Sequence, residues 1–134
     1  MGGRKGARET VLKILYRLDF LKGDKVEEII EEEIRGKSLD REYIEEVIKG
    51  ILNRKSEIDE EINRFSKRWK IEKMNPVDRN ILRIGCYEII FKGDIPPKVS
   101  INEAVELAKK YGSEKSAAFV NGILDKLAKE LQKT

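Results

Sequence analysis

The amino-acid sequence predicts an all-α protein, and three observations support this fold class. Apolar residues recur at intervals of three and four along almost the whole chain, which is the spacing of amphipathic helices. No segment keeps the alternation of apolar and polar residues that a half-buried strand requires. Glycine, proline and helix-capping residues separate the periodic segments. We therefore expect about seven helices.

The first half of the chain should contain four of these helices. Gly23 should end the first and Gly36 the second, and Ser38 or Asp40 can cap the third. The third and fourth helices are either continuous or broken near Asn53. The four apolar stripes are Ala7, Val11, Leu15 and Leu18; Val26, Ile29, Ile30 and Ile34; Tyr43, Ile44, Val47, Ile48 and Ile51; and Ile58, Ile62 and Phe65.

The second half opens with a strong helix start in NPVDRNILRIGCYEIIFKG. Asn75 is an N-cap candidate, Pro76 suits the first helical position, and Asp78 falls in the first turn. This helix should run to about Lys92.

Two more helices should follow. Ser100 and Glu103 in SINE have the spacing of a capping box, so they should open a helix that Gly112 closes. Ser113 should then cap the last helix, which runs to about Leu131.

A chain of 134 residues suits one domain or two small, closely packed subdomains. The change of pattern near residues 70–75 suggests a division there. We expect helical subdomains of about 1–72 and 73–134, packed as a single domain covering residues 1–134.

The composition excludes several classes of protein. The chain has no histidine and one cysteine, Cys86, so it cannot form an intramolecular disulfide, an ordinary zinc site or a histidine-dependent catalytic site. An enzyme would need carboxylates such as Glu88 and Glu103, or a lysine, and their spacing supports no such site. No apolar run approaches the ~18 residues of a membrane span. We expect a soluble, cytoplasmic protein without metal or cofactor.

The charge is unevenly distributed, although the net charge is only +3. Residues 1–22 carry six cations and two carboxylates, whereas residues 23–33 carry six carboxylates and one cation. A basic end beside an acidic segment suggests a polyanionic partner on one side only.

Two basic segments are candidates for nucleic-acid binding. GGRKGAR at residues 2–8 places three cations among glycines, which suits either an arm that follows phosphates or a frayed, solvated terminus. RFSKRWK at residues 64–70 interleaves cations with rings, as single-stranded RNA sites do. Because Phe65 and Trp69 are four residues apart, however, the pattern favours one helical face turned toward the core.

The apolar segment 77–91 should form a central helix, so its charged residues need partners. Arg83 and Glu88 should each meet another helix or a binding partner, and Cys86 should be a small buried residue.

Asn121-Gly122 is a hairpin dipeptide, but the surrounding spacing is helical. Within a helix, Gly122 should allow a neighbouring backbone to approach.

Four segments in order resemble the NusB family of bacterial transcription antitermination factors: ARETVLKILYRLDF (7–20), VDRNILRIGCYEI (77–89), IPPKVSINEAVELAKKYG (95–112) and FVNGILDKL (119–127). The resemblance implies two packed helical bundles and a non-enzymatic role. It also implies binding of the boxA RNA of ribosomal RNA leader transcripts together with ribosomal protein NusE, and loading onto RNA polymerase with other Nus factors. Because no methyltransferase domain follows, we do not expect one of the related RNA methyltransferases.

The resemblance also implies roles for particular residues. Arg4, Lys5 and Arg8 should contact phosphates, Tyr16 and Phe119 should stack on bases, and Asn121 should turn toward the RNA. Lys98 and Lys115 should extend the basic surface, and Lys115 stands where relatives can carry an acid. The residues expected to bind NusE are Asp78, Arg79 and Arg83. A single RNA face would require the first and last helices to be neighbours.

Two alternatives remain open at this point. The chain is a purely protein-binding helical adaptor if its basic residues serve only solubility. A homodimer is possible if surface meant for NusE pairs two copies instead.

Overall fold

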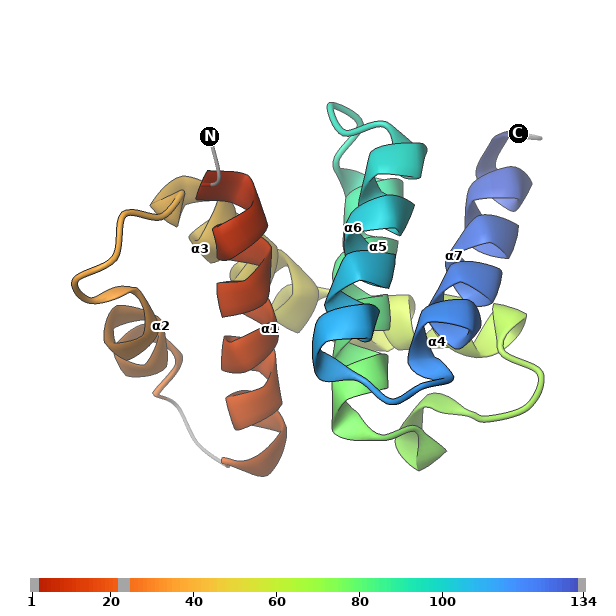
Figure 1. The fold of residues 1–134 in the computed structure, drawn as a ribbon, viewed down its shortest axis with the longest axis horizontal. Helices are drawn as coiled ribbons and strands as arrows, with labels where there is room; N and C mark the ends of the chain where they lie inside the picture. The colour runs from red at the N-terminus through yellow and green to blue at the C-terminus, as the bar shows by residue number, and fades with distance from the viewer. Residues whose placement is uncertain (1–2, 22–24, 133–134) are drawn as a thin grey trace.

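The structure confirms an all-α fold with helices in the predicted order. The computed structural model describes residues 3–21 and 25–132, and no strand occurs within these ranges. Its elements are α1 (Gly3–Phe20), α2 (Val26–Ile34), α3 (Arg41–Asn53), α4 (Lys55–Phe65), the short 3-10 helix η1 (Ile71–Lys73), α5 (Pro76–Phe91), α6 (Pro97–Tyr111) and α7 (Ser116–Gln132) (Figure 1).

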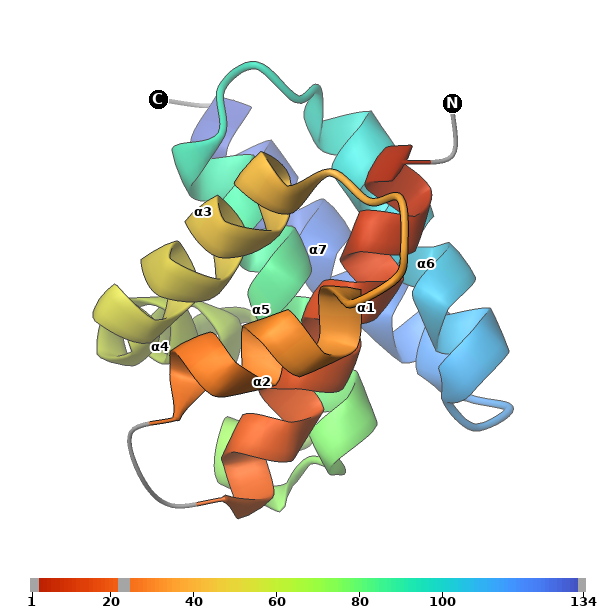
Figure 2. The same ribbon diagram turned by 90° about the vertical axis from the view of Figure 1, so that its left-hand side faces the viewer.

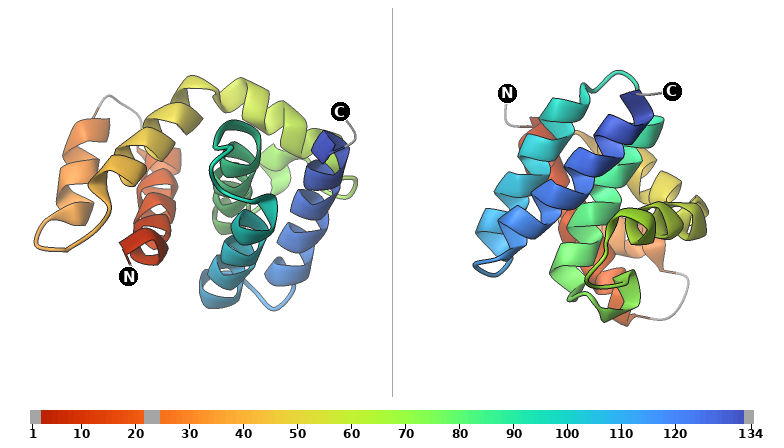
Figure 3. Two further views of the ribbon diagram at one scale, coloured as in Figure 1. Left: turned by 90° about the horizontal axis from the view of Figure 1, so that it is seen from above. Right: turned by 90° about the vertical axis from the view of Figure 1, so that its right-hand side faces the viewer.

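Helix α5 lies at the centre of the molecule, which explains its nearly continuous apolar sequence. It contacts α1 and α3 on one side and α4, α6 and α7 on the other (Figures 1 and 3). Every residue from 80 to 89 is buried. Cys86 is fully buried, as predicted, and burial raises the pKa of its thiol to about 12. Helix α2 packs against α1 at the edge of the molecule (Figure 2).

The connections of α4 bear on the subdomain boundary. Asp59 in α4 pairs with Arg83 in α5, and Arg64 in α4 pairs with Glu130 in α7. The buried apolar residues of both halves also form one continuous cluster. The division near residues 70–75 stays a prediction, and we propose that α4 belongs with the C-terminal helices.

A buried glutamate connects four of the helices. Glu88 in α5 is 1% exposed and accepts two hydrogen bonds from the guanidinium of Arg8 in α1, at 2.8 and 3.0 Å. It also accepts a hydrogen bond from the hydroxyl of Tyr43 in α3, and Ser100 Oγ in α6 donates a further hydrogen bond to it at 2.6 Å. Glu88 therefore meets other helices, as expected. Because the charge is buried, each of these donors is needed to offset its lost hydration.

The predicted capping box at Ser100 and Glu103 is wrong. Helix α6 begins three residues earlier, at Pro97, where the fixed φ of proline suits the first helical turn and its missing N–H costs nothing. Ser100 therefore lies inside the helix, and its hydroxyl is used by Glu88 instead.

Other boundaries are mostly as predicted. Asp40 and Asn75 cap α3 and α5 with their side chains, and α3 and α4 separate at Arg54. Ser113 does not cap α7, which begins at Ser116; the N–H of Ser113 instead donates to Ser116 Oγ at 2.9 Å. The predicted stop at Gly23 lies outside the described residues.

The N-terminal basic segment is not a flexible arm within the described residues. Helix α1 already begins at Gly3, so Arg4, Lys5 and Arg8 lie on helical turns. Gly2 lies outside the described part of the chain.

The expected role of Gly122 is also wrong. Gly122 is exposed, and a Cβ placed on it would meet no atom within 4 Å, so no neighbouring backbone approaches it. The close approach occurs at Gly85 in α5, where a Cβ would lie 2.5 Å from Leu124 Cδ1 in α7. Val120 and Leu124 face the core, as predicted.

Replacing Glu88 by Gln should lower the free energy of unfolding by roughly 3–5 kcal/mol, because Arg8 would keep its buried charge without a counter-charge. Urea denaturation of wild type and variant measures the loss. Glu106→Gln, at an exposed position of the neighbouring α6, is the matched control and should change stability by less than about 0.5 kcal/mol. A loss below about 1 kcal/mol in Glu88→Gln would show that the buried pair contributes little.

Replacing Gly122 and Gly85 by alanine should change the stability of the protein in opposite directions. Gly122→Ala should stabilise the protein by about 0.4–1 kcal/mol, because the helix gains a better former and the added methyl meets nothing. Gly85→Ala should destabilise it by about 1–3 kcal/mol through overpacking against Leu124. Thermal unfolding of both variants tests this, and equal effects would contradict the packing described.

Candidate nucleic-acid interface

The residues expected to bind RNA lie at two ends of the molecule. Arg4 and Lys5 are in the first turn of α1, whereas Tyr16 lies twelve residues later, roughly 18 Å along the helix axis. Lys98 is exposed in the first turn of α6, at the same end as the start of α1 (Figure 1). Helices α5 and α6 lie between α1 and α7 (Figures 1 and 3). The condition for a single RNA face, that the first and last helices are neighbours, is therefore not met.

Arg8 is not available to a phosphate group. Its side chain is 6% exposed and is held by Glu88, with Glu103 at 3.8 Å from its Nη1. Burial alone would lower the pKa of Arg8, but the hydrogen bonds to Glu88 and the surrounding negative groups raise it. Its expected role in phosphate contact is corrected to a structural one.

Arg4 and Lys5 differ in how accessible they are to a ligand. The guanidinium of Arg4 lies over the ring of Tyr43, 4.6 Å from its centroid, and its Nη2 is 3.4 Å from Asp40. Lys5 is exposed and forms no ion pair within the described residues. It lines a small hollow between α1 and α6 with Glu9, where Lys110 of α6 pairs with Glu9 at 2.9 Å.

Tyr16 is exposed at the C-terminal end of α1, so its ring is available for stacking. Its side chain contacts Phe20 one turn later, with 5.1 Å between the ring centroids. Tyr16 lines a hollow together with Lys13, Val77 at the start of α5 and Tyr111 at the end of α6. The C-terminal end of α1 and the start of α7 lie at the same end of the molecule (Figure 1).

A larger groove at this end contains Phe119 and Lys115. One wall is the connection between α4 and α5, and the other is the turn between α6 and α7 with the first turns of α7. The groove has a volume of about 880 Å³. We call it the Trp69–Phe119 groove, and the polar and aromatic residues that line it include Arg68, Trp69, Lys73, Asp78, Lys115 and Phe119.

The prediction that Trp69 packs in the core with Phe65 is wrong. Helix α4 ends at Phe65, so the two residues do not share a helical face. Trp69 is 47% exposed, and Arg68 Cζ lies 5.7 Å from the centre of its ring. The alternation of cations and aromatic rings in RFSKRWK indicates a binding site. Nothing in the sequence marks Lys73 as a part of it.

Asn121 is exposed on α7, one position before the open surface at Gly122. It does not line the Trp69–Phe119 groove. Its expected orientation toward RNA stays a prediction.

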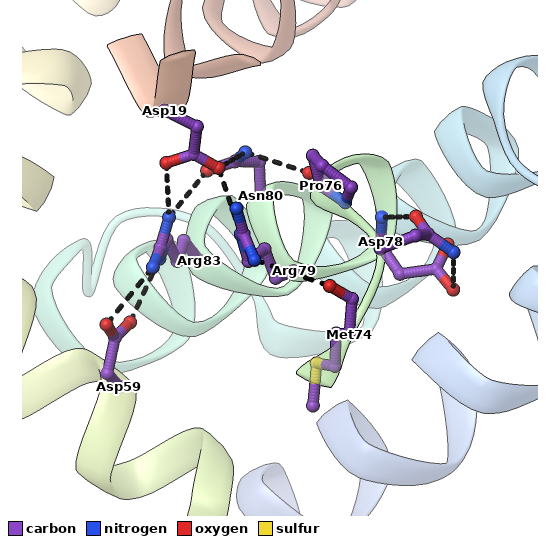
Figure 4. Close-up of polar contacts among 9 residues, drawn as sticks. Asp19, Asp59, Met74, Pro76, Asp78, Arg79, Asn80 and Arg83 are labelled. Atoms are coloured by element: carbon purple, nitrogen blue, oxygen red, sulfur yellow. Dashed lines mark hydrogen bonds and ion pairs between the residues drawn. The ribbon is translucent and has the colours of Figure 1, made fainter. Parts of the chain in front are cut away.

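The three residues expected to bind the protein partner are used largely within the chain (Figure 4). Arg83 is 6% exposed and binds Asp59 through two hydrogen bonds of 2.9 and 3.1 Å, and Asp19 at 3.2 Å. Arg79 donates to Asp19 at 2.9 Å and retains 20% exposure of its side chain. Of the two arginines, only Arg79 presents appreciable surface to a partner.

Asp78 belongs to the Trp69–Phe119 groove rather than to this ion-pair network. Its backbone N–H donates to Asn75 Oδ1 at 2.8 Å, and its Oδ2 accepts from the Asn75 amide at 3.1 Å. Its Oδ1 is buried and accepts no hydrogen bond from the described residues. Asp78, predicted for the protein partner, therefore lies with residues predicted for RNA.

Asp19 connects the end of α1 to the start of α5. Burial alone would raise its pKa, but hydrogen bonds from Asn80 and Arg79 and the charges of Arg83 and Arg79 lower it below the ordinary range. The sequence does not predict this role for Asp19, because an acidic residue near the end of a basic helix is usually expected to be a solvated surface residue.

No group of residues in the described ranges has the composition of a metal site. No helix there is long and apolar enough to cross a membrane.

Comparison with known proteins identifies relatives over nearly the whole chain. The model of the NusB family matches residues 5–129. The transcription antitermination protein NusB of Ruminiclostridium cellulolyticum is 45% identical, over 95% of this chain and 89% of its own. NusB of Geobacter sulfurreducens is 42% identical, over 98% of this chain and 97% of its own.

Solved structures agree with these relatives. NusB of T. maritima superposes with a TM-score of 0.88 at 42% identity, covering 95% of this chain and 91% of its own. A structure of antitermination factors NusB and NusE in complex with double-stranded RNA has a TM-score of 0.83 at 33% identity, covering 97% of this chain and 98% of that one.

Replacing Asp19 by Asn should destabilise the protein in a pH-dependent way. The folded pKa of Asp19 is lowered, so its stabilisation is complete above the unfolded value of about 3.9 and is lost as the pH falls through the folded value. Asp19→Asn should therefore cost roughly 3–5 kcal/mol at pH 7 and progressively less below about pH 4. Urea denaturation at several pH values from about 3 to 7, the range over which aspartate titrates, measures the difference in stability between wild type and variant.

The matched control is Asp125→Asn, which removes an exposed carboxylate paired with Lys129 on α7. Its effect should stay below about 1 kcal/mol at every pH. A destabilisation by Asp19→Asn that does not change with pH would contradict the proposed contribution of the charge.

Proposed function

This chain belongs to the NusB family of transcription antitermination proteins, and we propose that it binds boxA RNA of ribosomal RNA leader transcripts together with ribosomal protein NusE. The NusB relatives that match nearly the full chain support the antitermination role. The NusB and NusE complex with double-stranded RNA, at 33% identity, supports RNA and NusE as the two kinds of partner.

The observation that carries the RNA proposal is the Trp69–Phe119 groove. It places Lys115 and the half-buried ring of Phe119, both expected to bind RNA, beside further cations and the exposed ring of Trp69. Rings that stack on unpaired bases, flanked by cations that neutralise phosphates, are the usual means of binding single-stranded RNA. Lys115 forms no ion pair within the described residues, so its charge is free for a phosphate.

Contacts at the other end would extend this site. We propose that Lys5 and Lys98, both exposed, and the partly engaged Arg4 contact the RNA backbone beyond the groove. Tyr16 and Asn121, both exposed, would add further contacts. Binding that depends on cations spread over both ends should weaken steeply with salt.

The proposed protein partner is NusE, bound near the start of α5. Arg79 retains exposed surface there, whereas Arg83 is buried and would act by holding α1, α4 and α5 in place. Together with other Nus factors, the pair would be loaded onto RNA polymerase and suppress early termination. This role is non-enzymatic and would place the protein in the cytoplasm.

Titration of a labelled boxA RNA with and without NusE tests the proposal. We expect boxA to bind more tightly than a scrambled RNA, and NusE to increase the affinity. Phe119→Ala should weaken boxA binding by about 5- to 150-fold, the range of one lost base stack. Equal affinity for boxA and scrambled RNA under all conditions would contradict specific recognition. Retained NusE binding without any RNA binding would favour a purely protein-binding adaptor.

The contribution of Lys115 is tested against a lysine on the same helix. Lys115→Ala should reduce the slope of log affinity against log salt by about 0.7, the value for one lost phosphate contact on a single strand. Lys126→Ala, also exposed on α7 but outside the groove, should leave the slope unchanged. Equal slopes in the two variants would remove Lys115 from the RNA site.

A further inference from the structure

The connection between α4 and α5 presents an aromatic ring on an ordered backbone. Ser66 Oγ donates to the carbonyl oxygen of Trp69, and the N–H of Ile71 donates to Asn63 Oδ1 at 2.7 Å. Lys70 Nζ donates to the carbonyl oxygens of Asn63 and Ser66 at 3.1 and 3.4 Å. These bonds fix the backbone on both sides of Trp69, although its ring is 47% exposed.

The part of this connection that follows Trp69 is anchored in the core. Ile71 and Met74 are 5% and 6% exposed, and η1, which begins at Ile71, is closed by backbone hydrogen bonds. The ring of Trp69 is therefore exposed because the buried neighbours and the turn orient it outward. An exposed large ring held by a fixed backbone binds a flat ligand with little further loss of conformational entropy.

The charges around Trp69 favour a polyanion. Arg68 lies against the ring, and Lys73 and Lys115 line the same groove. None of these three cations forms an ion pair within the described residues. The acids in the groove are Glu114 and Asp78, and Asp78 is 8% exposed and bound to Asn75.

We infer that Trp69 is a second base-stacking residue of the proposed RNA site, with Arg68 and Lys73 neutralising the phosphates on either side of the stacked base. The inference rests on the proposed function, because it extends the same groove to the wall opposite Lys115 and Phe119. It assigns the RFSKRWK segment to single-stranded RNA, since a base can lie flat on Trp69 only when it is unpaired.

Trp69 is the one tryptophan of the chain, so its own fluorescence reports on the contact. Adding a short single-stranded boxA RNA to the wild-type protein should quench this fluorescence with the same midpoint as binding measured by a label on the RNA. Trp69→Ala should weaken that RNA by about 5- to 150-fold, whereas Trp69→Phe, which keeps a ring, should retain most of the affinity. Unchanged thermal unfolding should show that both variants remain folded, because the hydrogen bond from Ser66 is to the backbone.

The cations are tested by their salt dependence. Arg68→Ala and Lys73→Ala should each reduce the slope of log affinity against log salt by about 0.7. Lys55→Ala, an exposed lysine on α4 outside the groove, is the matched control and should leave the slope unchanged.

The outcomes separate this inference from the proposed function. If Phe119→Ala weakens RNA binding but Trp69→Ala does not, the inference fails and the proposed function stands. If the wild type binds no RNA with or without NusE, both fail. If duplex RNA or NusE alone quenches Trp69 while single-stranded RNA does not, the groove wall binds that partner and the inference is overturned.

Discussion

The structure depends on the burial of the Glu88 carboxylate at the centre of the helix assembly. A charge that is 1% exposed is unfavourable unless donors surround it, and the donors come from α1, α3 and α6. Apolar packing alone tolerates small shifts of one helix along another. A guanidinium that must meet both oxygens of one carboxylate does not, so Arg8 and Glu88 fix the position of α1 along α5.

A second network of hydrogen bonds and ion pairs fixes the first half of α5 against its neighbouring helices. Asp19 of α1 and Asp59 of α4 both bind Arg83, while Asn80 and Arg79 bind Asp19 (Figure 4). Helix α5 is thus tied to its neighbours near both of its ends. The start of α5 also adjoins the Trp69–Phe119 groove, so the network that holds this end in place supports the wall to which Asp78 belongs.

Much of the fold could be predicted from the sequence because helix periodicity and caps are local. Asn75 and Pro76 specify the start of α5 without reference to the rest of the chain. The errors arose where a side chain is used by a distant residue. Ser100 has the spacing of a cap but bonds Glu88, and Arg8 has the position of a phosphate ligand but is buried by α5 and α6. Trp69 could not be placed because a helix stop at Phe65 has no glycine or proline to mark it. The groove itself joins residues 68–78 to residues 113–119, and no local pattern encodes that proximity.

The burial of Cys86 gives the folded protein a chemical property that its surface does not reveal. The chain has no other thiol, and this one is fully buried with a pKa raised to about 12. Thiolate is the reactive form, so oxidants and alkylating reagents have no target while α5 stays packed. Covalent labelling of Cys86 therefore measures how often the core opens. It follows too that the protein can be modified at an introduced surface cysteine without first removing its own.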